Sequence, residues 1–385
     1  MYNLYNKIKR RSIIEYNNYK SFSTKRKILV FESDDWGSIR MPNKEIYNRL
    51  ISKNIKFSLD DSFDKYDTLA SENDLNCLIE ILSSIKDKND NNAKITLNTV
   101  VTNPNFEKIK ASNYTEYYYE VFTETLKKYP NHENSFKLWE KGISLNVFKP
   151  QFHGREHLNV LMWLNSLKEN HYGVRDAFED NVFSVLVNKK EDERIHFLSA
   201  FNYKQIEDLK FLEKSFIEGL EIFFSIFGFK PKSMIAPCYT WDGNIEKIAL
   251  SNGIKYIQSF LTQNYSLYTR KLNSKEYIYH YTGEKNNNNQ IYLVRNCEFE
   301  PSRIENPNYL SCLKEIENAF NKNKPAIVVS HRINFIGGLD IRKRDRNLKL
   351  FKDLLNDIVV KWPDVEFMFS DELGDLIDNN QFNSK

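Results

Sequence analysis

The strongest constraint on the fold is a repeated alternation between short apolar segments and longer segments with helical periodicity. The apolar segments are rich in β-branched residues and close on polar residues, a pattern typical of short buried strands. They are residues 27–32, 94–101, 149–152, 233–236, 256–259, 291–295, 326–330 and 365–369. Because amphipathic segments separate most of them, the pattern predicts an α/β fold of parallel strands with helical crossovers.

The intervening segments carry apolar residues at helical spacing. These predicted helices are residues 43–53, 72–85, 115–128, 157–169, 203–227, 242–251, 311–321 and 348–360. No repeat or linker divides the chain, so we expect one domain over residues 1–385, with its core at about 27–372 and an extension at 1–26. Insertions are expected at 130–142 and 264–289, and a surface hairpin within 277–293 around the polar loop 286–289.

Charge and composition exclude several classes of partner. The chain has 55 Lys and Arg against 52 Asp and Glu, and this near balance gives no strong field for nucleic acid. Residues 1–26 are basic and polar, without the apolar core of a secretory signal. No uncharged apolar run approaches the roughly 20 residues that span a bilayer. We therefore expect a cytoplasmic protein without a transmembrane segment; the sequence does not encode its oligomeric state.

Two carboxylates follow the first predicted strand. Asp34 and Asp35 come directly after residues 27–32, where an α/β barrel places its catalytic loops. One carboxylate can bind a cation, whose charge keeps the other ionised and able to accept a proton. Taken alone, the pair fits better with a turn that leads into the helix after Pro42.

Two histidines follow the third predicted strand. His153 and His157 are four residues apart, a spacing that on a helical turn places Cβ atoms about 5–6 Å apart. Both imidazoles can then reach one metal ion, and together with Asp35 they form an open site with positions left for water and substrate. Zinc suits these ligands best, and cobalt, nickel or manganese would also be accepted.

Other strand ends and loops supply further candidates. His331 ends the strand 326–330, where an imidazole can protonate a leaving group. In the loop 235–242, Pro237 fixes the backbone, and Tyr239 and Trp241 are candidates for stacking on a sugar, although core packing explains both rings almost as well. Trp36 and Arg155 are further candidates for substrate contact. A phosphate-binding glycine loop and a serine nucleophile elbow are both missing from the sequence.

The order of these features resembles the polysaccharide deacetylase superfamily. The matching positions are the paired aspartates Asp34 and Asp35, the histidines His153 and His157, the loop 236–239, and His331. The resemblance implies a distorted (β/α) barrel of about seven strands. It further implies a hydrolase that removes an acetyl group from an N- or O-acetylated sugar or polysaccharide precursor. In that family Asp34 would be the general base, His331 the general acid, and Asp35, His153 and His157 the metal ligands.

Two departures from the family pattern leave alternatives open. Ile235 stands where the family has an arginine that pairs with the base, and the arginines that remain to replace it are Arg155, Arg295 and Arg332. Ser33 precedes the aspartates where an aromatic is commoner, and Trp36 follows them. One alternative is a glycoside hydrolase that uses Asp34 with a second carboxylate from Glu298, Asp242 or Asp371. The other is a non-catalytic carbohydrate-binding relative.

Overall fold

The centre of the molecule is a mostly parallel sheet. The computed structural model describes residues 12–382 except 14, 18, 58–60, 172, 191–192 and 274–276, so residues 1–11 of the predicted extension lie outside the described residues. The strands, in spatial order, are β12 (Ile291–Val294), β9 (Tyr256–Ser259), β8 (Ser233–Ile235), β5 (Phe148–Phe152), β2 (Ile95–Thr99), β1 (Lys27–Trp36), β14 (Ala326–His331) and β13 (Cys297–Glu298), with β15 (Val365–Met368) also pairing with β1. The ladders between them are parallel, which confirms the predicted α/β class and all eight predicted strands.

The two end strands of this sheet are consecutive along the chain. Residues 291–298, here called the joining segment, pair first with β9 and then with β14. At the change of partner, the Arg295 N–H donates to the Ser259 carbonyl at 2.9 Å and the Asn296 N–H donates to the Ile327 carbonyl at 3.0 Å. Among the described residues no ladder joins β12 to β13. The sheet edges are therefore brought together by one continuous stretch of chain rather than by a closing ladder.

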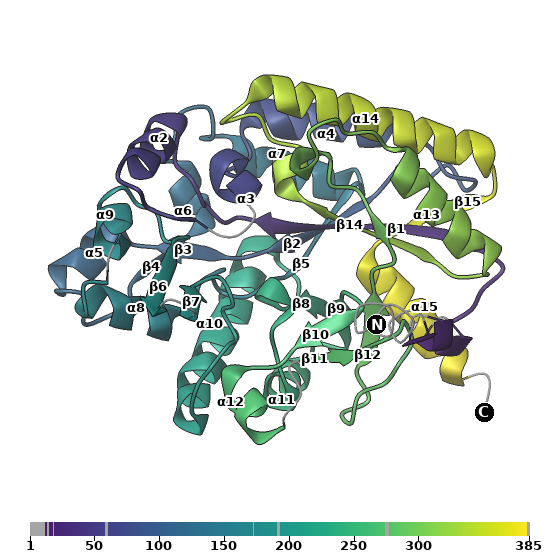
Figure 1. Cartoon of the computed structure of the whole chain (residues 1–385). Helices are drawn as coiled ribbons and strands as arrows, with labels where there is room; N and C mark the ends of the chain where they lie inside the picture. Colours follow the sequence, from purple (N-terminus) through teal and green to yellow (C-terminus); the bar gives the residue numbers. More distant parts are fainter. Residues whose placement is uncertain are drawn as a thin grey trace, which may run out of the picture.

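Helices cover the sheet on both sides, and short elements gather beyond its carboxyl edge. In Figure 1, α4, α13 and α14 lie above the strands and α10, α11 and α12 lie below them. The helices are α2 (Lys44–Ser52), α3 (Asp61–Tyr66), α4 (Glu72–Ser84), α5 (Phe106–Ala111), α6 (Phe122–Leu126), α7 (Ser135–Ser144), α8 (Val160–Lys168), α9 (Val174–Glu179), α10 (Leu209–Phe227), α11 (Gly243–Ser251), α12 (Leu267–Leu272), α13 (Leu310–Asn321), α14 (Ile341–Lys361) and α15 (Ser370–Phe382). The described residues also form three antiparallel strand pairs: β3 (Thr102–Pro104) with β4 (Tyr119–Val121), β6 (Leu186–Lys190) with β7 (Glu193–His196), and β10 (Thr262–Asn264) with β11 (Tyr277–Tyr279).

Alternation along the strands divides the side chains between two faces. On β1, Leu29 and Phe31 join the large apolar cluster that also contains residues of α4, α13 and α14. Ile28 and Val30 belong instead to a separate cluster with residues of α15, and we call their face the inner face. The same alternation places Glu32 and Asp34 on the inner face, above the apolar residues. The inner face is therefore apolar at its amino end and charged at its carboxyl end.

Two predicted helices differ from the structure. The predicted helix 115–128 is instead strand β4 followed by the short helix α6, because Tyr119–Val121 pairs with β3. The predicted helix 157–169 begins only at Val160, after the N-cap Asn159. The expected hairpin around the loop 286–289 forms, since Lys285 and Ile291 make an antiparallel bridge and the Tyr292 N–H donates to the Glu284 carbonyl at 2.9 Å. Residues 277–279 are not part of it, because β11 pairs with β10.

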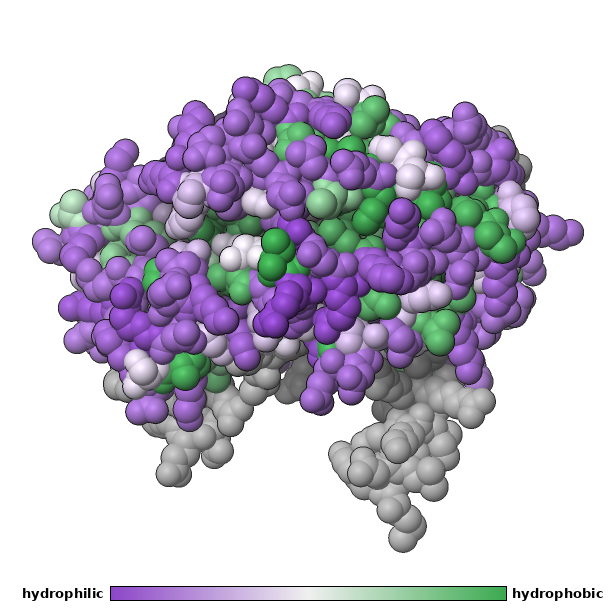
Figure 2. Space-filling model, turned by 90° about the horizontal axis from the view of Figure 1, so that it is seen from above, coloured by the Kyte–Doolittle hydropathy of each residue, from purple (hydrophilic) through white to green (hydrophobic). Residues whose placement is uncertain are grey.

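The outer surface is largely hydrophilic where it is seen from above. Figure 2 shows this face, on which apolar residues occur as small groups among hydrophilic ones. Exposed apolar side chains on the helices of this layer include Ile341 and Val360 of α14 and Leu310 of α13. Within the described part of the chain, none of the helices combines the length and the apolar character needed to cross a membrane.

Candidate metal centre

Three predicted ligands meet at the carboxyl end of the sheet. One ligand atom from each of Asp35, His153 and His157 can be chosen so that all three lie within 4.8 Å of one another. The Asp35 Oδ1 atom lies 3.4 Å from the His153 Nε2 atom and 3.3 Å from the His157 Nε2 atom. All three residues are buried. The structure therefore brings together the carboxylate and the two imidazoles expected from the sequence.

The backbone around the histidines differs from the predicted helical turn. Residues 153–157 lie between β5 and α8, outside any helix. Gly154 has a φ of +100°, a left-handed value that no residue of an α-helix adopts. The two imidazole ring centroids are nevertheless 5.0 Å apart. The expected proximity of the rings is thus correct, but a loop rather than a helix produces it.

The three side chains suit a divalent cation. His153 Nδ1 donates to the Ile235 carbonyl at 2.9 Å, which fixes the ring so that Nε2 is the nitrogen that faces Asp35 Oδ1. Burial lowers the pKa of His157 to about 3, which keeps this imidazole neutral. Burial of Asp35 favours its neutral form, but Arg40 and the imidazoles hold its pKa well below the ordinary value. Two imidazoles and a carboxylate fit zinc or a similar cation.

Asp34 is held by an arginine of the joining segment. Arg295 donates from Nη1 to Asp34 Oδ2 at 2.7 Å and from Nη2 to Asp34 Oδ1 at 2.6 Å, a bidentate pair. Asn98 Nδ2 donates to Oδ1 at 2.8 Å. Burial raises the pKa of Asp34, but the Arg295 guanidinium more than offsets this, and the net shift is downward. Asp34 is therefore an ionised carboxylate.

Arg295 is itself fixed by two further groups. Its Nε donates to Glu32 Oε2 at 2.6 Å, and its Nη1 also donates to the Tyr239 hydroxyl at 2.8 Å. Burial lowers the pKa of Arg295, but Asp34, Tyr239 and Glu32 raise it well above its ordinary value. Both Glu32 and Asp34 belong to the inner face of β1, so a single guanidinium links two carboxylates of one strand.

The other two candidate arginines have different partners. Arg155 Nε donates to Glu156 Oε2 at 2.7 Å, and its guanidinium also pairs with Glu218. Arg332 donates to Asp67 Oδ1 at 3.1 Å from Nε and at 2.9 Å from Nη2. Of the three arginines considered, Arg295 is the one that contacts Asp34.

His331 lies between two carboxylates, those of Asp34 and Glu300. The β1–β14 register places Asp34 opposite His331, and His331 Nε2 is 3.8 Å from Asp34 Oδ2. Its Nδ1 is 2.5 Å from Glu300 Oε1. Burial lowers the pKa of His331, but Glu300 and the aspartates raise it to about 9. With 19% of its side chain exposed, His331 is a protonated imidazole at the edge of the site.

Four residues of the site were not predicted: Glu32, Arg40, Asn98 and Glu300. Glu32 lies two residues before Asp34 on β1, and Asn98 lies two residues after Thr96 on β2. Because side chains two residues apart on a strand share a face, alternation along β1 and β2 is a signal that could have identified Glu32 and Asn98. Arg40 and Glu300 lie in loops after strands, where the sequence carries no comparable signal.

The predicted substrate-contacting residues have different surroundings. Trp36 and Trp241 are 1% and 0% exposed, so core packing rather than a sugar-stacking surface describes their rings. Trp36 packs edge-on against Trp139 with centroids 5.6 Å apart. Pro237 is buried and begins a short 3₁₀ turn. Tyr239, at the end of that turn, is partly exposed and contacts Arg295, which leaves it as the aromatic of this group that faces the site.

The carboxylates of the glycoside hydrolase alternative bond to groups outside the site. Asp242 caps α11 and accepts hydrogen bonds from the hydroxyl groups of Tyr203, Ser266 and Thr269. Asp371 pairs with Lys149 near the amino end of β5. Glu298 is exposed on β13. The recorded contacts of these three carboxylates do not include Asp34.

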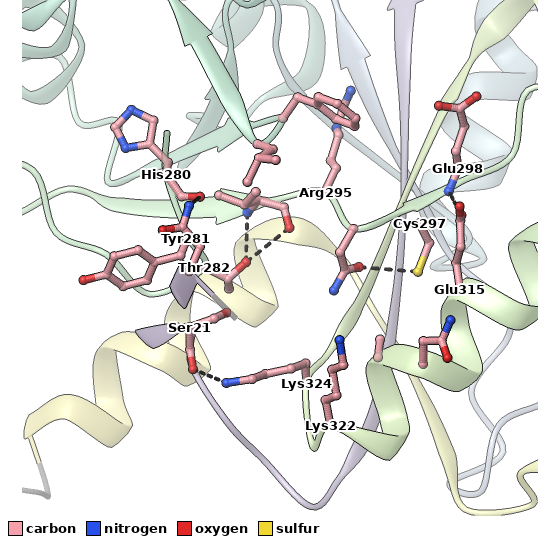
Figure 3. A pocket seen from close by; sticks show the side chains of 17 residues that line it. Ser21, His280, Tyr281, Thr282, Arg295, Cys297, Glu298, Glu315, Lys322 and Lys324 are labelled. Carbon is pink, nitrogen blue, oxygen red and sulfur yellow. Dashed lines mark hydrogen bonds between the residues drawn. The ribbon is translucent and has the colours of Figure 1, made fainter. Parts of the chain in front are cut away.

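A groove of about 350 Å³ lies along the joining segment. Figure 3 shows that Lys322 and Lys324 border one side of it and that His280, Tyr281 and Thr282 border another. Several of its polar groups bond one another: Thr282 pairs with the Val294 backbone, and Lys324 donates to the Ser21 carbonyl. Arg295 lines the groove, but none of the three metal ligands does. The groove is therefore distinct from the metal centre.

Comparisons with known proteins give only distant similarity. No family model and no curated protein matches the sequence. A putative polysaccharide deacetylase from Mycobacterium smegmatis aligns with 10% identity over 94% of this chain and 93% of that chain, with a TM-score of 0.43. A putative glycoside hydrolase/deacetylase from Parabacteroides distasonis aligns with 9% identity, coverage of 92% and 72%, and a TM-score of 0.46. A 4-alpha-glucanotransferase from Thermococcus litoralis aligns with 9% identity over 90% of this chain, which spans 40% of that enzyme, with a TM-score of 0.43. Similarity at this level identifies no activity.

Proposed function

We propose that the protein is a metal-dependent hydrolase that removes an acetyl group from an N- or O-acetylated sugar or polysaccharide precursor. The observation that carries the proposal is the position of Asp35 Oδ1, which faces both imidazole Nε2 atoms at 3.3–3.4 Å, beside an ionised Asp34 and a protonated His331. This set contains metal donors, a proton acceptor and a proton donor in one buried cluster.

The roles follow from the protonation states. A divalent cation held by Asp35, His153 and His157, most simply zinc, would polarise the acetyl carbonyl and make water more acidic. Asp34 accepts a proton from the attacking water, because Arg295 and Asn98 hold its carboxylate ionised and fixed in direction. His331 donates its proton to the departing nitrogen or oxygen.

The strand register supports these roles of Asp34 as proton acceptor and His331 as proton donor. Asp34 and His331 stand opposite each other on neighbouring parallel strands, and 3.8 Å separates Asp34 Oδ2 from His331 Nε2. A base and an acid on adjacent strand ends can approach the same reacting carbon from two directions. Glu300 holds the other nitrogen of His331 and so sets the direction of the imidazole.

The carbohydrate class of the substrate rests on the sequence resemblance and on the aromatic groups near the site. Tyr239 and Phe260 are both partly exposed, with ring centroids 5.9 Å apart, and Tyr239 contacts Arg295. Partly exposed aromatic rings beside a polar centre suit a sugar, which has both apolar and hydroxylated surfaces.

The test is acetate release from a panel of N- and O-acetylated sugars and oligosaccharides, with and without a chelator. We expect metal-dependent release that Asp34→Asn and His153→Ala abolish. Asp371→Asn is the matched control, since Asp371 is also a buried acid but pairs with Lys149. Unchanged acetate release from both site variants would refute the proposal. New reducing ends that require both Asp34 and Asp371 would instead favour the glycoside hydrolase.

A further inference from the structure

The two carboxylate oxygens of Asp35 have different partners. Oδ1 faces the Nε2 atoms of His153 and His157. Oδ2 accepts a hydrogen bond from Arg40 Nη2 at 3.3 Å. Arg40 is buried, 5% exposed, and follows Asp35 by five positions, in the loop after β1. A buried arginine thus occupies one oxygen of the aspartate whose other oxygen belongs to the metal centre.

Arg40 is held in this position from its far side. Its Nε lies 3.8 Å from Asp67 Oδ2, and Asp67 in turn accepts two hydrogen bonds from Arg332. Arg332 also donates to the Ser38 carbonyl, within the loop that carries Arg40. The Arg40 guanidinium lies 5.2 Å from the ring centroid of Phe63. Arg40 therefore joins Asp35 to a second buried carboxylate through separate nitrogens.

The loop backbone is fixed independently of these charges. The Ile39 N–H donates to Asn103 Oδ1 at 2.9 Å, and Asn103 Nδ2 donates to the Gly37 carbonyl at 2.9 Å. Asp35 itself has a φ of +70°, a conformation that few non-glycine residues adopt. A rigid loop with an unusual backbone at Asp35 presents this carboxylate in one orientation.

We infer that Arg40 is a positioning residue of the metal centre, which binds Oδ2 of Asp35 so that Oδ1 alone is presented to a cation. This inference rests on the metal centre of the proposed function. With Oδ2 occupied, the protein supplies three donor atoms, and the remaining positions stay open for water and substrate. The competing explanation is that Arg40 only balances the buried charges of Asp35 and Asp67.

The first test measures zinc affinity of the purified full chain by competition with a chromophoric chelator. Loss of an outer-shell partner typically lowers metal affinity roughly 10- to 100-fold, and we expect Arg40→Met to fall in this range. We expect Arg40→Lys to lose less, because a lysine keeps the charge but cannot contact Asp35 and Asp67 with separate nitrogens. Arg344→Met is the matched control, since Arg344 is also buried and pairs with Asp74 at 2.8 Å. We expect the control to leave zinc affinity unchanged.

The second test uses the visible spectrum of the cobalt-substituted protein, which reports coordination number independently of activity. When Oδ2 is released in Arg40→Met, Asp35 can use both oxygens, so we expect the higher coordination number to lower the absorption intensity severalfold. Zinc affinity equal to or tighter than that of the wild type, with an unchanged cobalt spectrum, would show that Arg40 only balances charge.

Two outcomes separate this inference from the proposed function. If Arg40→Met does not fold, Arg40→Lys decides, and wild-type affinity in that variant overturns the positioning role. Wild-type protein that binds zinc as described but releases no acetate would refute the deacetylase proposal while leaving the Arg40 result standing. Wild-type protein without measurable zinc affinity would overturn both.

Discussion

The two ends of the inner face use the same strands for different purposes. At the amino end, Ile28 and Val30 pack with Leu373 and Ile377 of α15 in an apolar cluster. At the carboxyl end, the next inner-face residues of β1 are Glu32 and Asp34, and the cluster becomes one of buried charges. The alternation of β1 does not change between the two ends; only the chemistry of the side chains does.

The joining segment shows the same transition. Ile291 and Leu293 belong to the apolar cluster at the amino end, and Arg295, two residues further, binds the inner-face carboxylates Glu32 and Asp34. The comparison teaches that apolar packing of α15 against one end holds the strands in place, while the other end uses that fixed frame to hold charged groups at short distances.

The carboxyl end also contains strained backbone. Asp35, Cys238 and Tyr239 have φ values of +70°, +54° and +51°. Left-handed conformations of non-glycine residues cost of order 1–3 kcal/mol each, so they persist where the surrounding structure enforces them. Substitutions at the two ends should therefore separate activity from stability.

The largest expected effect is on activity at the carboxyl end. Asp34→Asn removes the proton acceptor while keeping the side-chain shape, and general-base catalysis contributes roughly 100- to 10,000-fold to rate. We expect acetate release to fall within this range, as measured by kcat/KM, with zinc affinity retained. Retained activity in this variant would contradict the assignment of catalysis to the carboxyl end of the inner face.

A large loss of stability is expected at the amino end. Leu373→Ala removes a fully buried side chain of α15 from the apolar cluster, and such truncations cost about 2–5 kcal/mol. The measurement is denaturant unfolding, with zinc affinity of the folded protein as the second readout. We expect affinity to stay at the wild-type value; a matching loss of affinity would show that the two ends are not independent.

A smaller loss of stability is expected from Gly374→Ala. A Cβ at this position would lie 2.4 Å from the Tyr256 ring, so α15 must shift away from β9. Overpacking of this kind costs about 1–3 kcal/mol in thermal or denaturant unfolding. Gly243→Ala is the control, because a Cβ there meets no atom within 4 Å. Equal stability of the two variants would contradict the close packing of α15.

The smallest effect concerns His331 and pH. The folded pKa of about 9 lies above the unfolded value of about 6.5. The stability that His331 contributes is therefore fully present below pH of about 6.5 and is lost as the pH rises through about 9. In the metal-free protein, NMR titration of the imidazole should give a high pKa that Glu300→Gln lowers, whereas Glu298→Gln should not. An unshifted titration in Glu300→Gln would remove Glu300 as the cause.

The strands and the metal ligands were predictable because both depend on local pattern. Apolar segments ending in Asp35, His153 and His331 mark strand ends, and parallel strands bring such ends to one edge. The partner of Asp34 was not predictable to the same degree. Alternation places Arg295 on the same face as Leu293, but its contact with Asp34 depends on which strands are neighbours, and that order is set by non-local packing.

The conformation of the loops could not be predicted from local sequence pattern either. The spacing of His153 and His157 fits a helical turn, but Gly154 takes a left-handed backbone conformation and the helix starts only at Val160. The segment 115–128 has helical periodicity, yet part of it pairs with β3 as a strand. In both cases tertiary contacts override a local preference that the sequence expresses correctly.

The joining segment makes the geometry of the base depend on a single stretch of backbone. The backbone of Arg295 is attached to Ser259 by one hydrogen bond, and Asn296 is attached to Ile327 and Pro325 through its N–H and its side chain. Opening of this stretch alone would withdraw the guanidinium from Asp34 while the remaining strands stay folded. Local unfolding of a few residues requires less free energy than global unfolding. Inactivation by heat should therefore precede loss of the fold.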